Sequence, residues 1–303
     1  MAYRAALLSG APAAEAGTLR LRMLADPRVT ALLGALAAWP EPLIASHKSP
    51  SQAFHHLAFL ADLGLRLGDP GVDAIVGRVL ERRDAHGIPL LGAKISEAYG
   101  GTGQPVSGWA LCDAPTVLYA LARLGHRDAA TDGAVSYLAS LYGPEGWGCH
   151  VSESLGSWRG PGRKDDPCPY ATLIMVKLLA EHDPDRYRER MEAGALVLLD
   201  LWGRSRDRHP YIFYMGTDFR KPKLPFIWYD ILHAAEVLSR VPGVRADPRF
   251  TDMLDTLEAA VAGSGFVPSS VYQPFKAWDF GQKKVRSDSL ELAVLEILRR
   301  SGR

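Results

Sequence analysis

The chain has 303 residues, of which 47% are apolar and 23% charged, with a formal net charge of +1 and an isoelectric point near 7.8. This composition is that of an ordinary globular protein, and it excludes a global electrostatic attraction to nucleic acid or to an anionic membrane. No run approaches the roughly 20 apolar residues of a membrane span, and the N-terminal residues lack the apolar core of a secretory signal. Three cysteines are an odd number that argues against a disulfide framework, so we expect a reducing compartment, the cytoplasm.

Two kinds of helix alternate along the chain after a short first hairpin, predicted over 17–40 with its turn at Asp26 and Pro27. A helix that is apolar on most sides is buried on most sides, whereas an amphipathic helix keeps one face in water. The sequence therefore predicts inner helices that alternate with outer ones. The inner helices begin near Ser51, Ala114, Cys168, Pro225 and, last, Ser287, and the outer ones near Val72, Thr131, Met191 and Phe250.

The outer helices end at equivalent turns, Gly87, Gly146, Asp207 and Gly265, which are 59, 61 and 58 residues apart. Such regularity indicates a repeat of about 60 residues over 51–303, after a shorter hairpin and loop over 1–50. The links from each outer helix to the next inner helix, 85–112, 142–167, 204–224 and 262–286, each exceed twenty residues, and loops of that length are usually functional. Because antiparallel hairpins return the chain to the same end, we expect these loops on one face, beside the N-termini of the inner helices. We predict one all-α domain over 1–303, a ring of about five to six helical hairpins.

Several segments resemble a known superfamily. LASLYGPEGWG, which ends at Gly148, is similar to the turn of the prenyltransferase and squalene-oxidase repeat, so the chain resembles the α/α toroid of squalene-hopene cyclases and protein prenyltransferase β subunits. WGCH, DDPCPYATL and the closing WDFGQKKVRSDSLELAVLEILRR look like uncharacterised prokaryotic proteins that carry this repeat. The resemblance implies a toroid and a substrate that is isoprenoid or otherwise amphiphilic.

The chain also departs from these enzymes. The Asp-x-Asp-Asp acid of the cyclases is missing, the nearest piece being Lys164, Asp165 and Asp166, and the DDxxD magnesium motif fails because position 169 is proline. Protein prenyltransferases hold zinc with an Asp, a Cys and a His on neighbouring inner helices. The resemblance implies a similar place for the ligands here, with a set that is richer in sulfur.

Three cysteines and a histidine are the candidate metal ligands. Cys112 and Cys168 open two successive inner helices, and Cys149 and His150 lie in the loop between them, so the ring would bring them together. Zinc prefers four ligands from Cys, His and carboxylate, and we predict a zinc site at Cys112, Cys149, Cys168 and His150, with Asp113 or solvent as other fourth ligands. Three alternatives remain: an iron–sulfur cluster on three thiolates, three buried apolar cysteines with no metal, and Cys168 as a nucleophile.

Cations precede the inner helices and aromatic residues lie among them, which predicts a positive rim for phosphate, diphosphate or carboxylate. Solvated loop charges and core aromatics are the alternatives. The cations are His47, Lys48, Arg159, Arg163, Lys164, Arg220, Lys221, Lys223, Lys283, Lys284 and Arg286. The aromatic residues are Trp109, Trp158, Trp228, Tyr229 and Trp278.

The candidate acid–base groups are His56, Asp113 and Asp230. His55 and His56 are adjacent in one helix and point about 100° apart, so only one can face the cavity. Asp230 and Asp62 are charges in apolar helices, where a carboxylate either belongs to a polar network or acts as acid or base.

The leading hypothesis is a zinc-dependent enzyme, a transferase, lyase or cyclase, acting on an anionic or amphiphilic small molecule. The alternatives are a scaffold with a structural metal and, third, a helical-repeat protein that binds nucleic acid. The near-neutral charge disfavours the last.

Overall fold

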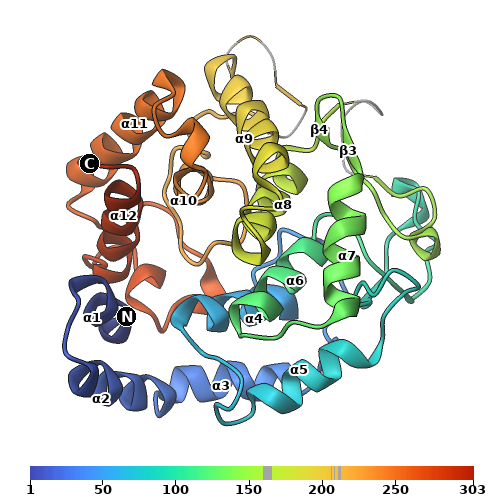
Figure 1. Ribbon diagram of the computed structural model, residues 1–303, viewed down its shortest axis with the longest axis horizontal. Coiled ribbons are helices and arrows are strands. Elements are labelled where there is room, and N and C mark those ends of the chain that lie inside the picture. The colour runs from blue at the N-terminus through green and yellow to red at the C-terminus, as the bar shows by residue number, and fades with distance from the viewer. Residues whose placement is uncertain (160–165, 206, 208, 211–212) are drawn as a thin grey trace.

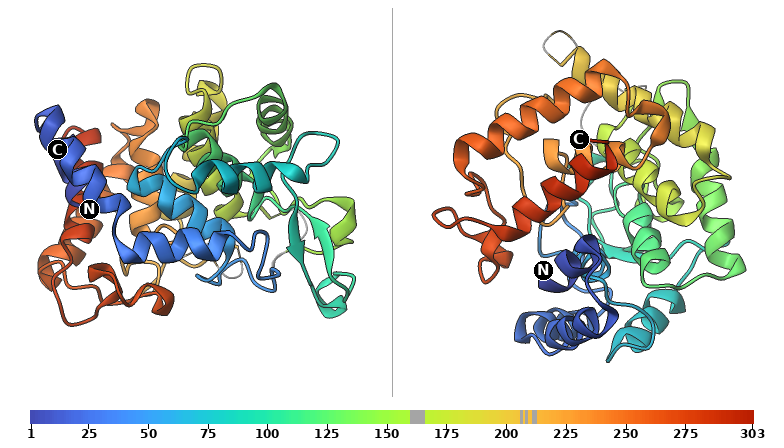
Figure 2. Two further views of the ribbon diagram at one scale, coloured as in Figure 1. Left: turned by 90° about the horizontal axis from the view of Figure 1, so that it is seen from below. Right: turned by 60° about the vertical axis from the view of Figure 1, so that its left-hand side comes forward.

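The computed structural model describes residues 1–159, 166–205, 207, 209–210 and 213–303, and it is mostly helical (Figures 1 and 2). The described part contains twelve α-helices and two small antiparallel sheets, which confirms the all-α class. In these ranges no helix combines the length and the apolarity that crossing a bilayer requires. The helices are α1 (Ala2–Ser9), α2 (Ala13–Leu24), α3 (Pro27–Leu36), α4 (Ala53–Leu63), α5 (Val72–Glu81), α6 (Ala114–Arg123), α7 (Ala129–Ser140), α8 (Pro169–His182), α9 (Arg188–Gly203), α10 (Ile231–Ser239), α11 (Pro248–Ser264) and α12 (Asp288–Arg300). The strands are β1 (Leu91–Ala93) with β2 (Val106–Gly108), and β3 (Tyr142–Gly143) with β4 (Gly146–Trp147).

The inner helices are α4, α6, α8 and α10, and nearly every residue of each is buried. They pack side by side in chain order, α4 on α6, α6 on α8 and α8 on α10. In contrast, α5, α7, α9 and α11 bury one face, and Figure 1 shows α3, α5, α7 and α11 nearer the edge of the molecule. The alternation of inner and outer helices therefore follows the predicted segments.

The first hairpin also lies where the sequence places it. Helices α2 and α3 meet at Asp26 and Pro27, and the Asp26 side chain caps α3 by accepting a hydrogen bond from the Arg28 amide at 2.9 Å. Helix α1 was not predicted, and it packs beside the far end of the chain. The Arg299 guanidinium donates to the Leu8 carbonyl at 2.6 Å, and Arg4 pairs with Glu296, so the two termini close the molecule.

Two inner helices differ from their predicted form. Helix α10 begins at Ile231, six residues after Pro225, because the Asp230 carboxylate caps it through the amides of Leu232 and His233. Helix α12 was expected to be buried on most sides, but only one of its faces is buried. Its main contact with an inner helix is with α10, and its Arg299 donates a hydrogen bond to the Leu8 carbonyl of α1.

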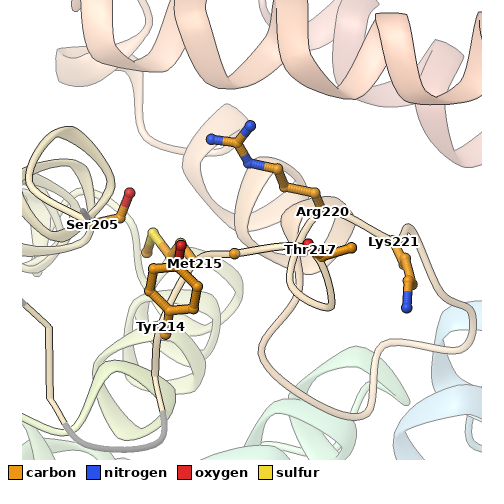
Figure 3. A pocket seen from close by; sticks show the side chains of 7 residues that line it. Ser205, Tyr214, Met215, Thr217, Arg220 and Lys221 are labelled. Atoms are coloured by element: carbon orange, nitrogen blue, oxygen red, sulfur yellow. The ribbon is translucent and has the colours of Figure 1, made fainter.

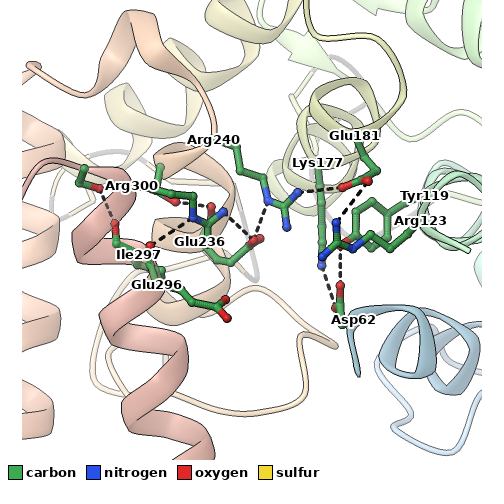
Figure 4. A network of polar contacts seen from close by, with 12 residues as sticks. Asp62, Tyr119, Arg123, Lys177, Glu181, Glu236, Arg240, Glu296, Ile297 and Arg300 are labelled. Carbon is green, nitrogen blue, oxygen red and sulfur yellow. Dashed lines mark hydrogen bonds and ion pairs between the residues drawn. The ribbon is translucent and has the colours of Figure 1, made fainter. Parts of the chain in front are cut away.

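The C-terminal ends of the inner helices are joined by buried charges, which we call the charge network (Figure 4). Glu236 of α10 accepts from Arg240 at 2.6 Å and from Arg300 at 3.2 Å, and Arg240 reaches Glu181 of α8 at 3.1 Å. Four of the contacts between helices join residues 57 to 64 positions apart, close to the predicted repeat. The pair of Asp62 and Lys177 spans about twice that separation. The network consists of Asp62, Tyr119, Arg123, Lys177, Glu181, Glu236, Arg240 and Arg300.

The long loops meet at the opposite end, beside the N-termini of α6 and α8. Trp109 and Ser152 exchange hydrogen bonds through the Trp109 carbonyl and amide, and Ala93 forms a bridge with Ile44. Gly146, at φ +104°, turns the β3–β4 hairpin so that Trp147 enters the core. The Trp147 carbonyl then accepts from the Cys168 amide at 2.8 Å, which fixes the start of α8 next to this hairpin.

Candidate functional site

Three thiols from distant segments meet at this end of the inner helices, and we call them the thiol cluster: Cys112, Cys149 and Cys168. The Cys168 thiol lies close enough to the thiols of Cys112 and Cys149 that both of them shift its pKa. Cys168 is the N-cap of α8, and its sulfur accepts from the Ala171 amide at 3.5 Å. The Leu111 amide donates to the His150 carbonyl at 2.9 Å, which ties the segment of Cys112 to that of Cys149.

Burial and neighbouring sulfur keep the central thiol protonated. Cys112 and Cys168 are 9% and 4% exposed. The pKa of Cys168 is raised above its usual value by the Cys112 thiol and by burial, and the contacts with Cys149 and the Ala171 amide only partly offset this. A thiol in this state is a weak nucleophile, so the arrangement disfavours nucleophilic chemistry at Cys168 unless a positive charge binds there.

His150, the fourth predicted ligand, has an exposed side chain. Desolvation lowers its pKa, so the neutral imidazole that a metal requires is the main form near neutral pH. Among the residues with described positions, no group of three or more His, Cys, Asp or Glu side chains has the arrangement of a metal site. The three thiols are therefore neighbours, but among the described residues neither they nor a set with a fourth donor converge on one point.

His47 and Asp113 form a buried pair beside the thiol cluster. The His47 Nε2 atom lies 2.7 Å from Asp113 Oδ2, and the His47 ring stacks on Trp158 with centroids 5.0 Å apart. Asp113 Oδ1 accepts from the Ala110 amide at 3.1 Å. His47 is 6% exposed, so this predicted rim cation is instead a buried partner of Asp113. Since both oxygens of Asp113 are engaged, this carboxylate orients His47 and the start of α6.

Asp230, a predicted acid–base group, is 1% exposed, and only one of its two carboxylate oxygens is hydrogen-bonded to the described residues. Its Oδ1 atom caps α10, whereas Oδ2 has no hydrogen-bond partner among the residues that the structure describes. Burial raises the pKa of Asp230 to about 7, with opposing contributions from the α10 amides and Lys223. A carboxyl with this pKa can donate or accept a proton near neutral pH.

The buried carboxyl predicts a specific dependence of stability on pH. Because the folded-state pKa is raised, the contribution of Asp230 to stability is present below about pH 4 and is lost as the pH rises through about 7. Asp230→Asn keeps a cap for α10 and removes the titration. In urea unfolding at pH 8 the variant should be more stable than the parent by about 2–4 kcal/mol, and the gain should vanish near pH 4. An equal difference at both pH values would contradict the raised pKa.

The histidines of the inner helices α4 and α10 are neutral near pH 7. His56 is half-buried with its ring edge-on to Phe275, and burial lowers its pKa. His55 and His233 are fully buried, and burial lowers the pKa of each to about 3. His55 Nε2 and His233 Nδ1 each face a carbonyl oxygen at 2.9 Å and must carry the ring proton. The sequence analysis did not single out His233. A polar residue in an otherwise apolar helix could have indicated it.

Some of the predicted cations and aromatic residues do gather near Trp228. The Lys48 ammonium lies 4.9 Å from the Trp228 ring, and Lys223 lies 3.4 Å from Asp218 and 6.0 Å from the Tyr272 ring. Burial lowers the pKa of Lys48. Tyr229 is buried and close enough to Cys168 that a charge on that thiol raises the pKa of Tyr229, in addition to the larger effect of burial.

The remaining predicted rim residues do not join this group. Trp109 donates from Nε1 to Asp84 at 2.8 Å, and Trp278 packs on Phe59 in the core under the guanidinium of Arg28. Lys283 and Lys284 are exposed in the loop before α12. Arg163 and Lys164 lie outside the described residues. Among the described residues the predicted cations do not form one continuous ring, and Lys48 and Lys223 approach the rings of Trp228 and Tyr272.

No protein-family model, curated protein or solved structure matches this chain.

Proposed function

We propose that the protein is a metal-dependent enzyme in which the thiol cluster binds a zinc ion. The observation that supports this proposal is that the thiols of Cys112 and Cys149, which come from separate segments, both lie close enough to Cys168 to shift its pKa. Thiolate sulfur is a preferred donor for zinc. The helix start at Cys168 also favours a negative charge on that sulfur once the proton has left.

The chemistry of the donor set fits zinc, although the thiols are not yet arranged around a common point. Zinc replaces the thiol protons, so binding is expected to turn the three sulfurs toward the ion at about 2.3 Å. The fourth donor is the His150 imidazole or solvent, because Asp113 is already engaged with His47 and the Ala110 amide. A bound zinc ion would supply a Lewis acid or an activated thiol or water.

The other side chains at this end support a substrate with an anionic head and an apolar body. Lys48 can attract the anionic group, whereas Asp218 partly neutralises Lys223, and Trp228 and Tyr229 supply apolar surface. Asp230 can move a proton at its free Oδ2 atom. The alternation of inner helices with outer ones supports the α/α toroid as the fold. An isoprenoid or similar amphiphile as the substrate class rests on the resemblance to the toroid enzymes alone.

The proposal is tested by metal analysis of full-length protein purified without chelator. About one equivalent of zinc per chain is expected, as for a single three- or four-ligand site. Iron with sulfide would favour an iron–sulfur cluster instead. Less than about a tenth of an equivalent of any transition metal, in protein made in zinc-supplemented medium, would remove the mechanism.

A scaffold with a structural metal is the second candidate, because Cys112 and Cys168 are almost fully buried. A structural site has four protein ligands, whereas a catalytic site keeps one position open. Replacement of zinc by cobalt makes the difference visible. If added azide or thiocyanate changes the cobalt absorption bands, a position is open and the enzyme is favoured. Bands that do not respond favour the scaffold.

A further inference from the structure

A cavity of about 410 Å³ lies apart from the thiol cluster, between the C-terminal end of α9 and the segment 213–221 (Figure 3). Its volume is in the usual range for small-molecule sites. Polar and charged side chains from both elements line it. The described lining includes Ser205, Tyr214, Met215, Thr217, Arg220 and Lys221.

Arg220 is the cation available to a ligand in this cavity. Its guanidinium lies 5.2 Å from the ring of Trp202, and within the described ranges no carboxylate pairs with it. Lys221 lies 3.7 Å from Asp218, which partly neutralises it. Figure 3 shows Arg220 extending toward the side of the cavity where Ser205 lies, while Lys221 points away. Arg220 is thus an uncompensated positive charge directed along the cavity.

The Trp202 side chain next to Arg220 is held in place by burial and a hydrogen bond. Trp202 is 5% exposed, and its Nε1 atom donates to Asp252 at 2.8 Å. A guanidinium that already contacts a fixed indole loses less conformational entropy when it binds an anion. Ser205 and Thr217 add hydroxyl groups on the same cavity. This set of donors matches the oxygens of a phosphate group, which arginine binds with two parallel hydrogen bonds.

We propose that this cavity binds a small organic phosphate monoester. The Arg220 guanidinium would hold the phosphate with the hydroxyls of Ser205 and Thr217, and Tyr214 and Met215 would contact the organic part. The cavity is larger than a free phosphate needs, which favours an ester over the inorganic ion.

This site is separate from the thiol cluster, so the inference goes beyond the proposed function. Phe219 lies between them, with its ring 5.9 Å from Trp202 and 5.0 Å from Tyr229. Tyr229 in turn is the neighbour of Cys168. The described lining of the cavity includes none of the three cysteines, so the two sites share no residue.

Isothermal titration of the full-length protein with phenyl phosphate tests the proposal, with inorganic phosphate and benzoate as the other probes. We expect saturable binding of phenyl phosphate that inorganic phosphate displaces and that weakens as salt is raised. Arg220→Gln should weaken it at least tenfold, and Thr217→Val less. The matched control Lys284→Gln, in an exposed loop, should bind as the parent does.

Three results would overturn the proposal: no saturation at millimolar phenyl phosphate, equal affinity of the parent and Arg220→Gln, or benzoate binding as tightly as phenyl phosphate. The melting temperature of Arg220→Gln is expected to equal that of the parent, because Arg220 is exposed. If that variant unfolds, Thr217→Val decides, since an unchanged affinity there would also contradict the site. Metal-free protein should still bind the probe, so failure of the zinc proposal and failure of this one are distinguishable.

Discussion

Glu236→Gln is expected to lower the free energy of unfolding by about 3 kcal/mol, since removal of one partner from a buried ion pair is strongly destabilising. Glu236 is 3% exposed and accepts hydrogen bonds from Arg240 at 2.6 Å and from Arg300 at 3.2 Å. Glutamine keeps the shape but not the charge, so two guanidinium groups would lose their common counterion. Urea unfolding at pH 7 measures the change.

The matched control is Asp200→Asn. Asp200 pairs with Arg204 on the surface of α9, where the two side chains are 44% and 49% exposed. Exposed pairs of this kind contribute little, so a change within about 0.5 kcal/mol is expected. If Glu236→Gln destabilises no more than this control does, the charge network does not hold the helix ends together.

The pH dependence gives a second check on Glu236. Burial alone would raise the pKa of this carboxyl, but Arg240, Arg300 and Lys177 outweigh it and hold the pKa well below the usual value. A depressed folded-state pKa means that the stabilisation is present above about pH 4.5 and is lost as the pH falls further. The stability deficit of Glu236→Gln should therefore shrink in acid. The stability gain of Asp230→Asn should also shrink there, so the two substitutions have effects of opposite sign that both fade as the pH falls.

Helix positions could be predicted from the sequence because burial leaves a strong periodic signal. An apolar segment such as 169–182 has no polar face, and the structure buries nearly all of it. The predictions were wrong at two places. At α10 the Asp230 side chain caps the helix and so fixes where it begins. At α12 only one face packs against other helices, and the other face is not buried. Neither feature changes the hydrophobic pattern, so the pattern could not reveal it.

The candidate site was predictable only where it depends on the repeat. Cys112 and Cys168 open successive inner helices, so a regular arrangement brings them together, and their contact follows that reasoning. The pair of His47 and Asp113 depends instead on how the loop before α4 folds over α6, and the two residues are 66 positions apart. Spacing does not encode this contact, and His47 therefore looked like a free cation.

The charge network was hidden for a similar reason. Asp62 stood out as a charge in an apolar helix, but its partners Lys177 and Tyr119 belong to two other repeats. A buried carboxylate needs a partner, and the sequence does not say which of 35 lysines and arginines supplies it.

Cys168→Ser is expected to lose bound zinc and, with it, the stabilisation that the metal provides. Removal of one thiolate should weaken zinc affinity at least about 100-fold, because changes in the outer shell alone cost 10–100-fold. A ligand that binds only the folded state raises its stability, so chelator should lower the melting temperature of the parent. The same chelator should leave the melting temperature of Cys168→Ser unchanged, as measured by thermal unfolding monitored by circular dichroism.

Asp113→Asn is the control that distinguishes loss of the metal from a disturbance of the packing beside the thiol cluster. It weakens a buried pair beside the thiol cluster but leaves all three sulfurs, so it should be less stable than the parent and still bind zinc. Zinc binding must displace the proton of the Cys168 thiol, whose pKa is raised, so the zinc affinity of the parent should rise with pH. An adventitious surface site made of carboxylates would not show this rise above pH 7. If chelator shifts the parent and Cys168→Ser equally, or shifts neither, the three thiols are no metal site, and their contact is only part of the core.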